Sequence, residues 1–342
     1  MKKIFIQKIV LLLLVSSVIV YAGGGSRNGT GGAAQLLIPV GAQGISLSGS
    51  NISSLRGIDA LYWNPAGISR VNYGVEATFS HMSYLADIGV NYGAVAFQVS
   101  DLGVFGVSLK SLSIGDIDVT TVENPDGTGQ TYAPQLITAG LTFARNLSDR
   151  ISVGITGNLI SEKLGLVSST GVAFNIGVMY TGLGGLDGLS FAIVMKNLGP
   201  QAKFSGSGLN VLAEASGYQR PTQYYTIDAA TYELPSSLEI GVAYAPIFTE
   251  SNSLLFSTTF QNNNFSGDQY KLGAEYTYNN LFSIRGGYTY APDYEDSEFI
   301  YGLTAGFGIN YEIEGLKVRL DYAYRDVDYF DSNHIFALTF GL

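Results

Sequence analysis

Residues 300–311 read IYGLTAGFGINY, and this stretch alternates between two kinds of side chain. One set is aliphatic or aromatic: Tyr301, Leu303, Ala305, Phe307, Ile309 and Tyr311. Between them stand Ile300 and then small or polar residues: Gly302, Thr304, Gly306, Gly308 and Asn310. Because successive side chains of a strand point to opposite faces, a two-residue period predicts a β-strand with one apolar face.

The same period recurs along the chain, for example at 172–180, 238–244, 272–278 and 318–325. In a soluble sandwich the aliphatic face would point inward. In a membrane barrel it faces lipid, the polar face lines the lumen, and aromatic residues gather at the two interfaces. The segments are about 10 residues long, which is the length that crosses a bilayer when tilted. The pattern therefore predicts a transmembrane antiparallel β-barrel.

Segments of this kind number about fourteen, an even number, as expected of a single-chain barrel. We predict strands at 73–84, 88–100, 103–114, 132–145, 150–162, 170–181, 187–198, 236–246, 253–262, 268–279, 281–290, 300–312, 315–326 and 334–342. The connections alternate between brief turns and longer loops, notably 115–131, 199–235, 291–299 and 327–333. Short periplasmic turns and long outer loops produce this alternation.

The last predicted strand ends the sequence. One of its faces carries His334, Phe336, Leu338, Phe340 and Leu342. A barrel in lipid must pair its final strand with its first, since an open edge leaves backbone groups unpaired. We therefore predict that this strand closes the barrel. Such an ending also implies the barrel-insertion machinery as a transient partner, which would read the alternating apolar residues.

The N-terminus has the features of a secretory signal peptide. Lys2, Lys3 and Lys8 are followed by an apolar run from Ile9 to Val20 and then by small residues. We predict cleavage after Ala22, so that residues 1–22 are removed on export to the bacterial outer membrane. A single membrane anchor, the rival interpretation, would need roughly 20 apolar residues, and about 12 are present.

The composition agrees with an exported barrel. The absence of cysteine excludes disulfides and cysteine-bound metals. A formal net charge of -10 argues against a nucleic-acid partner. Only 13% of the residues are charged, against about 25% in ordinary soluble proteins. Yet no second run of about 18 apolar residues offers a membrane helix.

No residue pattern indicates catalysis, and we expect neither an enzyme nor a cofactor or metal. His81 and His334 are the only histidines and lack ligand-type spacing. There is no Gly-x-Ser-x-Gly elbow, and glycine-rich 182–188 lacks the Lys-Ser/Thr of a phosphate loop. Outer-membrane lipid and lipopolysaccharide are the expected surroundings. Cation bridging to lipopolysaccharide by acidic loops is one possibility, and solvated acidic loops are the simpler one. These loops carry Asp293, Glu295, Asp296, Glu298, Asp326, Asp328 and Asp331.

Residues 23–72 precede the first strand and lack strand-like alternation. Within them, Asn64 is suited to cap a short helix with Pro65 at its first position. Gly67 would end that turn beside Trp63. A barrel of fourteen strands leaves a lumen too wide for its own side chains to fill. We therefore predict a hatch inside the lumen over 23–72 and the barrel over 73–342, with a surface turn as the alternative.

Two sets of residues that we predict to face inward fit such a hatch. Glycines would make room for inserted backbone, and they are Gly154, Gly177, Gly241, Gly273, Gly302 and Gly306. Charged residues could pair with Arg56, Asp59 and Arg70 of the hatch. These charged residues are Lys196, Glu239, Lys271, Glu275, Arg285, Arg319, Asp321 and Arg325. The same charges weigh against a wholly apolar lumen.

Three pieces of the N-terminal segment carry a family resemblance. They read LLIPVGA at 36–42, ISLSG at 45–49 and DALYWNPAG at 59–67. This pattern resembles the PorV/PorQ family, and its Asn-Pro-Ala-Gly element is similar to that of the wider FadL group of hydrophobic-compound transporters. Gln43 stands where the family usually has a basic residue, and 23–35 is unusually rich in glycine. The resemblance implies a fourteen-stranded barrel with an N-terminal hatch. For the PorV branch it implies work with type IX secretion.

The connection 199–235 is longer than a barrel turn needs. Its aromatic and aliphatic residues indicate an interface, and we assign partner or ligand binding to Tyr218, Tyr224, Tyr225, Ile227 and Tyr232. The main hypothesis is an accessory barrel for protein secretion that binds secretion-system subunits or cargo at the cell surface. The alternative is a FadL-like channel for uptake of a hydrophobic small molecule. A porin, the third class, would need an open lumen.

Overall fold

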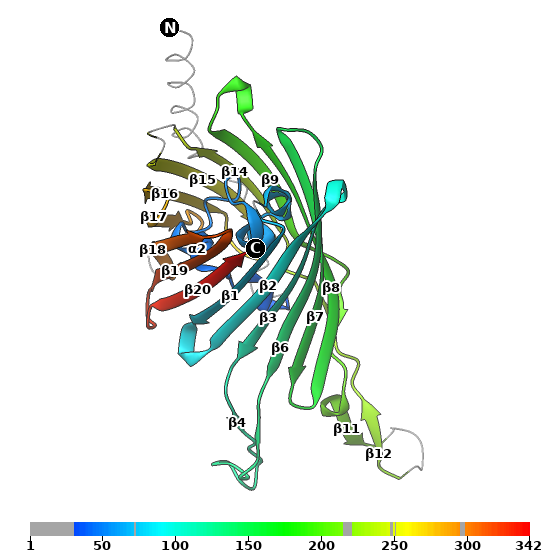
Figure 1. The fold of residues 1–342 in the computed structure, drawn as a ribbon. Helices are drawn as coiled ribbons and strands as arrows, with labels where there is room; N and C mark the ends of the chain where they lie inside the picture. Colours follow the sequence, from blue (N-terminus) through cyan, green and yellow to red (C-terminus); the bar gives the residue numbers. More distant parts are fainter. Residues whose placement is uncertain (1–30, 72, 215–220, 247–248, 250, 295–297) are drawn as a thin grey trace.

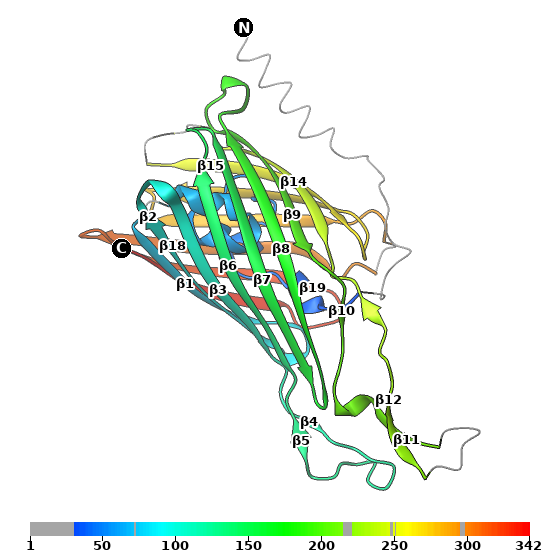
Figure 2. The same cartoon turned by 90° about the vertical axis from the view of Figure 1, so that its right-hand side faces the viewer.

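A computed structural model describes residues 31–71, 73–214, 221–246, 249, 251–294 and 298–342. The predicted signal peptide, residues 1–22, lies outside the described residues. Fourteen strands form one closed antiparallel barrel (Figures 1 and 2). In wall order they are β1 (Val75–Ser83), β2 (Gly89–Val99), β3 (Gly103–Ser113), β6 (Gln135–Asn146), β7 (Ile151–Leu164), β8 (Val167–Thr181), β9 (Leu189–Leu198), β14 (Ser237–Tyr244), β15 (Ser253–Asn263), β16 (Gln269–Tyr278), β17 (Phe282–Tyr290), β18 (Tyr301–Ile313), β19 (Leu316–Val327) and β20 (Asn333–Gly341). The predicted fold class is confirmed. Among the described residues, no helix has the length and apolarity needed to span a membrane.

β20 closes the barrel, because it pairs with both β19 and β1. Its register with β1 runs from Glu76↔Gly341 to Ser83↔His334. The backbone of Leu342 extends this ladder, since its N–H donates to the carbonyl of Val75 at 2.9 Å. Each wall strand thus has a neighbour on both sides, which is the condition for a sheet in lipid. Closure by the C-terminal strand is confirmed.

The outward face of the wall is apolar. Large exposed side chains recur at alternate positions, among them Phe79, Leu141, Ile155, Ile284, Leu303 and Phe336. Near the short-turn rim, Phe105 packs against Phe97 and Phe143 with ring centroids 6.0 and 5.0 Å apart, as in an aromatic girdle. Keeping such a surface out of water is worth about 25 cal/mol per Å². A closed barrel with this exterior is an outer-membrane protein.

The two rims of the barrel differ in their connections. One rim has mostly short turns, such as 100–102, 279–281 and 314–315. The other rim carries the connections 114–134 and 199–236. Two hairpins from these connections project beyond the wall (Figure 2), β4–β5 (Ile117–Asp118 and Thr131–Tyr132) and β11–β12 (Asn210–Ala213 and Gln223–Thr226). Short turns mark the periplasmic rim and long loops the outer rim.

The gap between the predicted strands 150–162 and 170–181 is too long. β7 and β8 continue through it and pair as far as Leu164↔Val167, so only Gly165 and Leu166 form the turn. Gly165 has a φ of 60°, which suits a tight turn. The period was lost here because both faces of the hairpin tip carry polar residues. The apolar pattern therefore stops before the strands do.

The period also predicts Tyr301 on the outward face with Leu303, and the structure places it inside. The register of β18 with β19 shifts between Tyr301 and Thr304. Such a bulge inserts an extra residue and reverses the alternation beyond it. The Tyr301 hydroxyl lies 2.8 Å from that of Tyr84, and its ring centroid lies 4.1 Å from the guanidinium carbon of Arg325.

Deleting residues 333–342 should prevent assembly. The deletion leaves the edges of β1 and β19 unpaired, and each unsatisfied backbone group in lipid costs several kcal/mol. We expect no folded barrel in lipid vesicles, measured as loss of the heat-modifiable band in gel electrophoresis.

The matched control replaces the hairpin 210–226 with two glycines. This hairpin lies outside the barrel wall, and the N–H of Ile227 donates to the carbonyl of Leu209 at 2.8 Å across its base. The control should keep the folded band. A folded band from the chain without 333–342 would contradict closure by β20.

Candidate functional site

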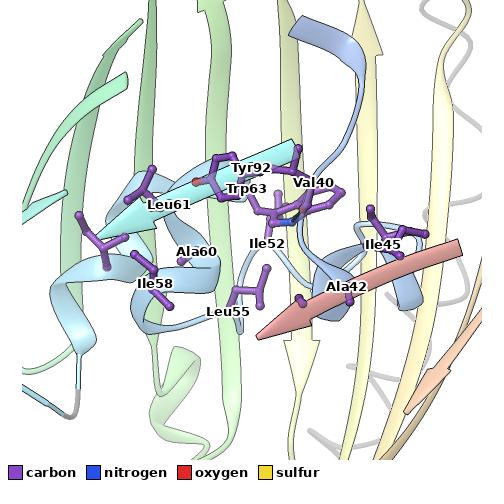
Figure 3. Close-up of a cluster of buried hydrophobic side chains, with 14 of the residues drawn as sticks. Val40, Ala42, Ile45, Ile52, Leu55, Ile58, Ala60, Leu61, Trp63 and Tyr92 are labelled. Carbon is purple, nitrogen blue, oxygen red and sulfur yellow. Dashed lines mark hydrogen bonds between the residues drawn. The ribbon is translucent and has the colours of Figure 1, made fainter. Parts of the chain in front are cut away.

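Residues 31–71, hereafter the lumenal segment, lie inside the barrel (Figure 1). They form five short helical turns: η2 (Ala34–Leu37), α2 (Ala42–Ser46), η3 (Gly57–Asp59), α3 (Ala60–Trp63) and η4 (Pro65–Arg70). Their apolar side chains share one buried cluster with inward side chains of the wall, such as Val90, Tyr92 and Val194. Figure 3 shows Trp63 and Tyr92 within this cluster. The lumen therefore contains an apolar core of its own.

Asn64 joins two parts of the lumenal segment. Its Oδ1 accepts a hydrogen bond from the N–H of Ala66 at 3.0 Å, which caps the start of η4. Its Nδ2 donates to the carbonyl of Ile52 at 2.8 Å. Pro65 stands at the first position of η4, where a missing N–H costs nothing. One completely buried amide thus fixes both the helix start and the preceding chain.

Trp63 and Gly67 pack the same turn tightly. Trp63 Nε1 donates to the carbonyl of Val40 at 3.1 Å. A Cβ added at Gly44 would lie 2.1 Å from that nitrogen, so the indole needs a glycine beneath it. A Cβ added at Gly67 would lie 2.5 Å from the Cβ of Ala60. Bulkier residues at either glycine would displace the turn.

Glycines in the wall receive the lumenal segment. On β7, a Cβ at Gly154 would lie 2.4 Å from the carbonyl carbon of Pro65. On β8, a Cβ at Gly177 would lie 2.1 Å from Asn64 Oδ1. These two positions form the seat of the Asn64–Pro65 turn.

Further round the barrel, β14, β16 and β18 provide a second seat. The added Cβ would lie 2.5 Å from Ile52 Cγ1 at Gly241, 2.3 Å from Ser50 Oγ at Gly273 and 2.5 Å from Ser46 Cβ at Gly306. Gly302 differs from the other five glycines, since its nearest neighbour is the ring of Tyr288 at 3.8 Å. It lies on the outer side of the lumenal segment.

A chain of ion pairs links the segment to the wall. Arg319 of β19 contacts Asp59 of the segment and Asp321 of its own strand, each at 2.5 Å. Arg285 of β17 contacts Asp321 at 2.6 Å and also pairs with Glu275 of β16. Arginine forks suit such shared carboxylates. This series of ion pairs therefore links η3 to strands β16, β17 and β19.

The two basic residues of the segment do not pair with carboxylates of the described wall. Arg70 donates to Ser152 Oγ at 2.9 Å and to the carbonyl of Asp149 at 3.1 Å. Arg56 is exposed in an inner cavity of about 210 Å³ that Asp59 and Lys317 also line. We predicted that three hatch residues would pair with inward-facing charges of the wall. Of these three, Asp59 alone does so, with Arg319.

An outer cavity of about 430 Å³ lies between the lumenal segment and the outer rim. One part of its lining is apolar: Leu36, Leu37, Ile38, Pro39, Ile45, Trp63, Phe299 and Ile300. Another part carries tyrosines and charges: Tyr62, Tyr84, Tyr294, Tyr301, Lys196, Glu239, Lys271, Glu298 and Arg325. Leu37 is 47% exposed although it lies within the barrel. The cavity thus presents an apolar surface beside a charged one.

The charges of the outer cavity are unevenly paired. Lys196 forms an ion pair with Glu239 at 3.0 Å and lies 5.2 Å from the Trp63 ring centroid. Lys271 donates to the neutral amide oxygen of Gln261. Arg325 donates to Asn333 Oδ1 at 2.6 Å. Within the described part of the chain, neither Lys271 nor Arg325 contacts a carboxylate.

Tyr62 holds the floor of the cavity in place. Its hydroxyl donates to the carbonyls of Leu36 and Ile38 at 3.2 and 3.1 Å. Burial, and next the charge of Glu239, raise the pKa of Tyr62 far above its ordinary value. The hydroxyl therefore stays protonated at any physiological pH, and its one proton is shared between the two carbonyls.

The residues assigned to the long loop occupy different surroundings. Tyr224, Tyr225 and Ile227 are 77%, 39% and 52% exposed on or beside the β11–β12 hairpin. Tyr232 lies in β13 (Thr231–Tyr232), which pairs with β10 (Ala202–Lys203). Its hydroxyl donates to Glu162 Oε2 at 2.7 Å, and burial raises its pKa to about 12. Tyr218 lies outside the described residues.

Lys110 on β3 is a lumenal residue that we did not single out from the sequence. Its Nζ donates to the carbonyls of Gln35 and Ile38 at 2.7 and 3.1 Å. The alternation Gly106, Ser108, Lys110 against outward Val107 and Leu109 was the available signal. A lysine on the small-residue face of a membrane strand has to face the lumen.

Replacing Gly154 with alanine should loosen the lumenal segment. The added methyl group would press on the backbone at Pro65, which has little room to move. We expect a loss of about 1–3 kcal/mol in stability, as for other overpacked sites. Thermal unfolding and protease cleavage within 31–71 would measure it.

Gly157 on the same strand provides the matched control. A Cβ there meets only the Phe174 ring at 3.6 Å, an ordinary contact. Gly157→Ala should therefore unfold like the unmodified protein. Equal stability of the Gly154 and Gly157 variants would show that the seat is not as tight as described.

No protein-family model and no curated protein matches the sequence. The CymD monoaromatic hydrocarbon channel matches in structure with a TM-score of 0.55 and 14% identity, over 89% of this chain and 97% of that chain. The Pseudomonas putida toluene transporter TodX matches at 0.54 and 15%, over 88% and 96%. The Ralstonia pickettii toluene transporter TbuX matches at 0.53 and 14%, over 88% and 97%. These proteins are channels and transporters, and at such low identity the likeness concerns the fold. It agrees with the wider resemblance to hydrophobic-compound transporters and does not reach the PorV/PorQ branch. The chain has the fold of outer-membrane hydrocarbon channels.

Proposed function

We propose that this protein is a channel through which hydrophobic small molecules with a polar head are taken up across the outer membrane. The outer cavity carries the proposal. Its volume of about 430 Å³ suits a small ligand, since such sites span roughly 300–1,000 Å³. It lies on the outer side of the lumenal segment, where a molecule from outside would arrive first. The fold likeness to channels for aromatic hydrocarbons supports the same function.

The lining indicates the chemistry of the ligand. The apolar side chains from Leu36 to Pro39 would contact an apolar body. Lys271 and Arg325 would contact the head, and an anionic head would supply the ion-pair partner that neither has among the described residues. Burying a cation without a partner is costly, so an anion that reaches them gains binding energy that a bare hydrocarbon does not.

In this proposal the lumenal segment acts as the hatch. It separates the outer cavity from the inner cavity, and its core residues Leu47 and Ile52 are completely buried between them. A molecule passing to the periplasmic side would therefore have to displace part of residues 31–71. Trp63, Asn64, Pro65 and Gly67 form the most tightly seated part. We assign them to positioning the hatch.

Trp63 offers a direct measurement, because it is the single tryptophan of the chain and lines the outer cavity. We expect decanoate to change its fluorescence in the nanodisc-embedded barrel and to bind more tightly than decanol. Lys271→Met should weaken decanoate binding about tenfold, or about 1.4 kcal/mol. Decanol binding should stay within about twofold, since the alcohol has no charge to lose.

Lys163→Met is the control for general charge loss. Lys163 is an exposed lysine of β7 and does not line the outer cavity. The Lys163→Met variant should bind decanoate and decanol with the same affinities as the unmodified protein. If the Lys271→Met variant binds decanoate as tightly as the unmodified protein does, Lys271 is not part of the binding site. Failure of both probes to bind the unmodified barrel would contradict the channel function itself.

One feature favours a second function, accessory to protein secretion in the manner of the PorV/PorQ family. The β11–β12 hairpin exposes Leu212 (62%), Tyr224 (77%) and Tyr225 (39%) to solvent, away from the barrel. Exposed aromatic residues of this kind are frequent at protein interfaces. Secretion-system subunits or secreted cargo would be the partners.

Replacing 210–226 with two glycines separates the two functions. If the hairpin binds a secretion partner, cross-linked purification from the native outer membrane should lose that partner, while decanoate binding is retained. An unchanged set of co-purified proteins would remove the second function. Loss of decanoate binding would instead place the hairpin in the uptake pathway.

A further inference from the structure

A small polar cavity of about 30 Å³ lies behind residues 35–38, against the inner face of the wall. Strands β3, β6, β7, β8 and β9 contribute its polar side chains, which include Ser108, Lys110, Thr138, Asn158, Asn175 and Asn197. One water needs about 10–15 Å³, so the space holds about two water-sized particles. It adjoins the outer cavity, since Leu36, Tyr62 and Asn197 line both, and none of the described residues that line it carries a carboxylate.

The charge in this cavity comes from Lys110, which is 4% exposed. Two protons of its ammonium group go to the carbonyls of Gln35 and Ile38, at 2.7 and 3.1 Å. Carbonyl oxygens are neutral, and Lys110 makes no ion pair within the described part of the chain. A buried ammonium without a counter-ion costs several kcal/mol. The Tyr62 ring centroid lies 5.1 Å from Nζ, and no described carboxylate pairs with the ammonium group, so an anion beside it would offset part of this cost.

The remaining lining offers donors. The Thr138 hydroxyl is buried, with the residue 7% exposed, and has no hydrogen-bond partner among the described residues. Asn175 uses its Oδ1 to accept the N–H of Asn197 at 2.8 Å, which leaves its NH₂ group to face other partners. Hydroxyl and amide donors around one ammonium group form a site for an anion. A water molecule would satisfy Thr138 and leave the charge of Lys110 uncompensated.

We propose that this cavity binds a small monovalent anion of the halide class, held by Lys110, Thr138 and the amide of Asn175. The site goes beyond the uptake function and does not depend on which molecule enters the outer cavity. Its ligand neutralises the lysine that holds residues 35–38 against the wall. The anion thus contributes to the attachment of the outer part of the lumenal segment.

The direct test is diffraction from crystals of the full barrel grown in sodium bromide. We expect an anomalous bromide peak between Lys110 Nζ and Thr138 Oγ1, and no such peak in crystals of Lys110→Met. Density without anomalous signal in the unmodified protein would identify water and overturn the proposal. A bromide peak that persists in Lys110→Met would overturn the assignment to that lysine.

Stability supplies a second readout that needs no crystals. The midpoint temperature of thermal unfolding should rise when sodium chloride replaces sodium gluconate at equal ionic strength. This rise should saturate with increasing chloride concentration. Thr138→Val keeps the side-chain shape and should raise the half-saturating chloride concentration about tenfold, or about 1.4 kcal/mol. Lys163→Met, on the exposed surface, should respond like the unmodified protein. A chloride response identical in the threonine variant would contradict the site, and so would the absence of any response.

Discussion

Lipid offers no hydrogen-bond partner, so every backbone N–H and carbonyl in the wall has to be paired within the barrel. The pairing of β20 with β1 meets this requirement, and the remaining architecture follows from it. A ring of fourteen strands encloses more space than its own side chains fill. The lumenal segment occupies that space with an apolar core, and glycines such as Gly154 and Gly177 let its backbone approach the wall.

The two faces of the wall have different roles. The outer face is apolar because it meets lipid, while the inner face carries the charges that orient the lumenal segment and line the outer cavity. Arg319 and Asp59 serve the first purpose, and Lys271 and Arg325 serve the proposed second one. An interior that mixes apolar and charged surface fits an amphipathic ligand better than a bare hydrocarbon. This chain shares its fold with hydrocarbon channels without sharing their sequences.

The wall could be predicted from the sequence, because the alternation of side chains records locally which face meets lipid. The prediction failed where the determinant is not local. Tyr301 turns inward through a bulge that depends on pairing with β19, and the 165–166 turn is hidden by polar residues on both faces. The alternation predicted that Lys271 and Arg325 face inward. It could not predict the specific pair of Asp59 with Arg319, because these residues are 260 positions apart in the sequence. Such contacts, and the cavity beside them, emerge only when the ring closes.

The position of the lumenal segment at the start of the chain has a consequence for assembly order. Its seats lie on strands as far apart in sequence as β7 and β18, and in several the fit leaves no room for a single methyl group. Backbone that packs this closely against several strands gives the wall contacts that it would not have on its own. If the segment is present while the sheet closes, these contacts would guide how the strands curve around it. The segment would then act as a template for the wall before β20 pairs with β1.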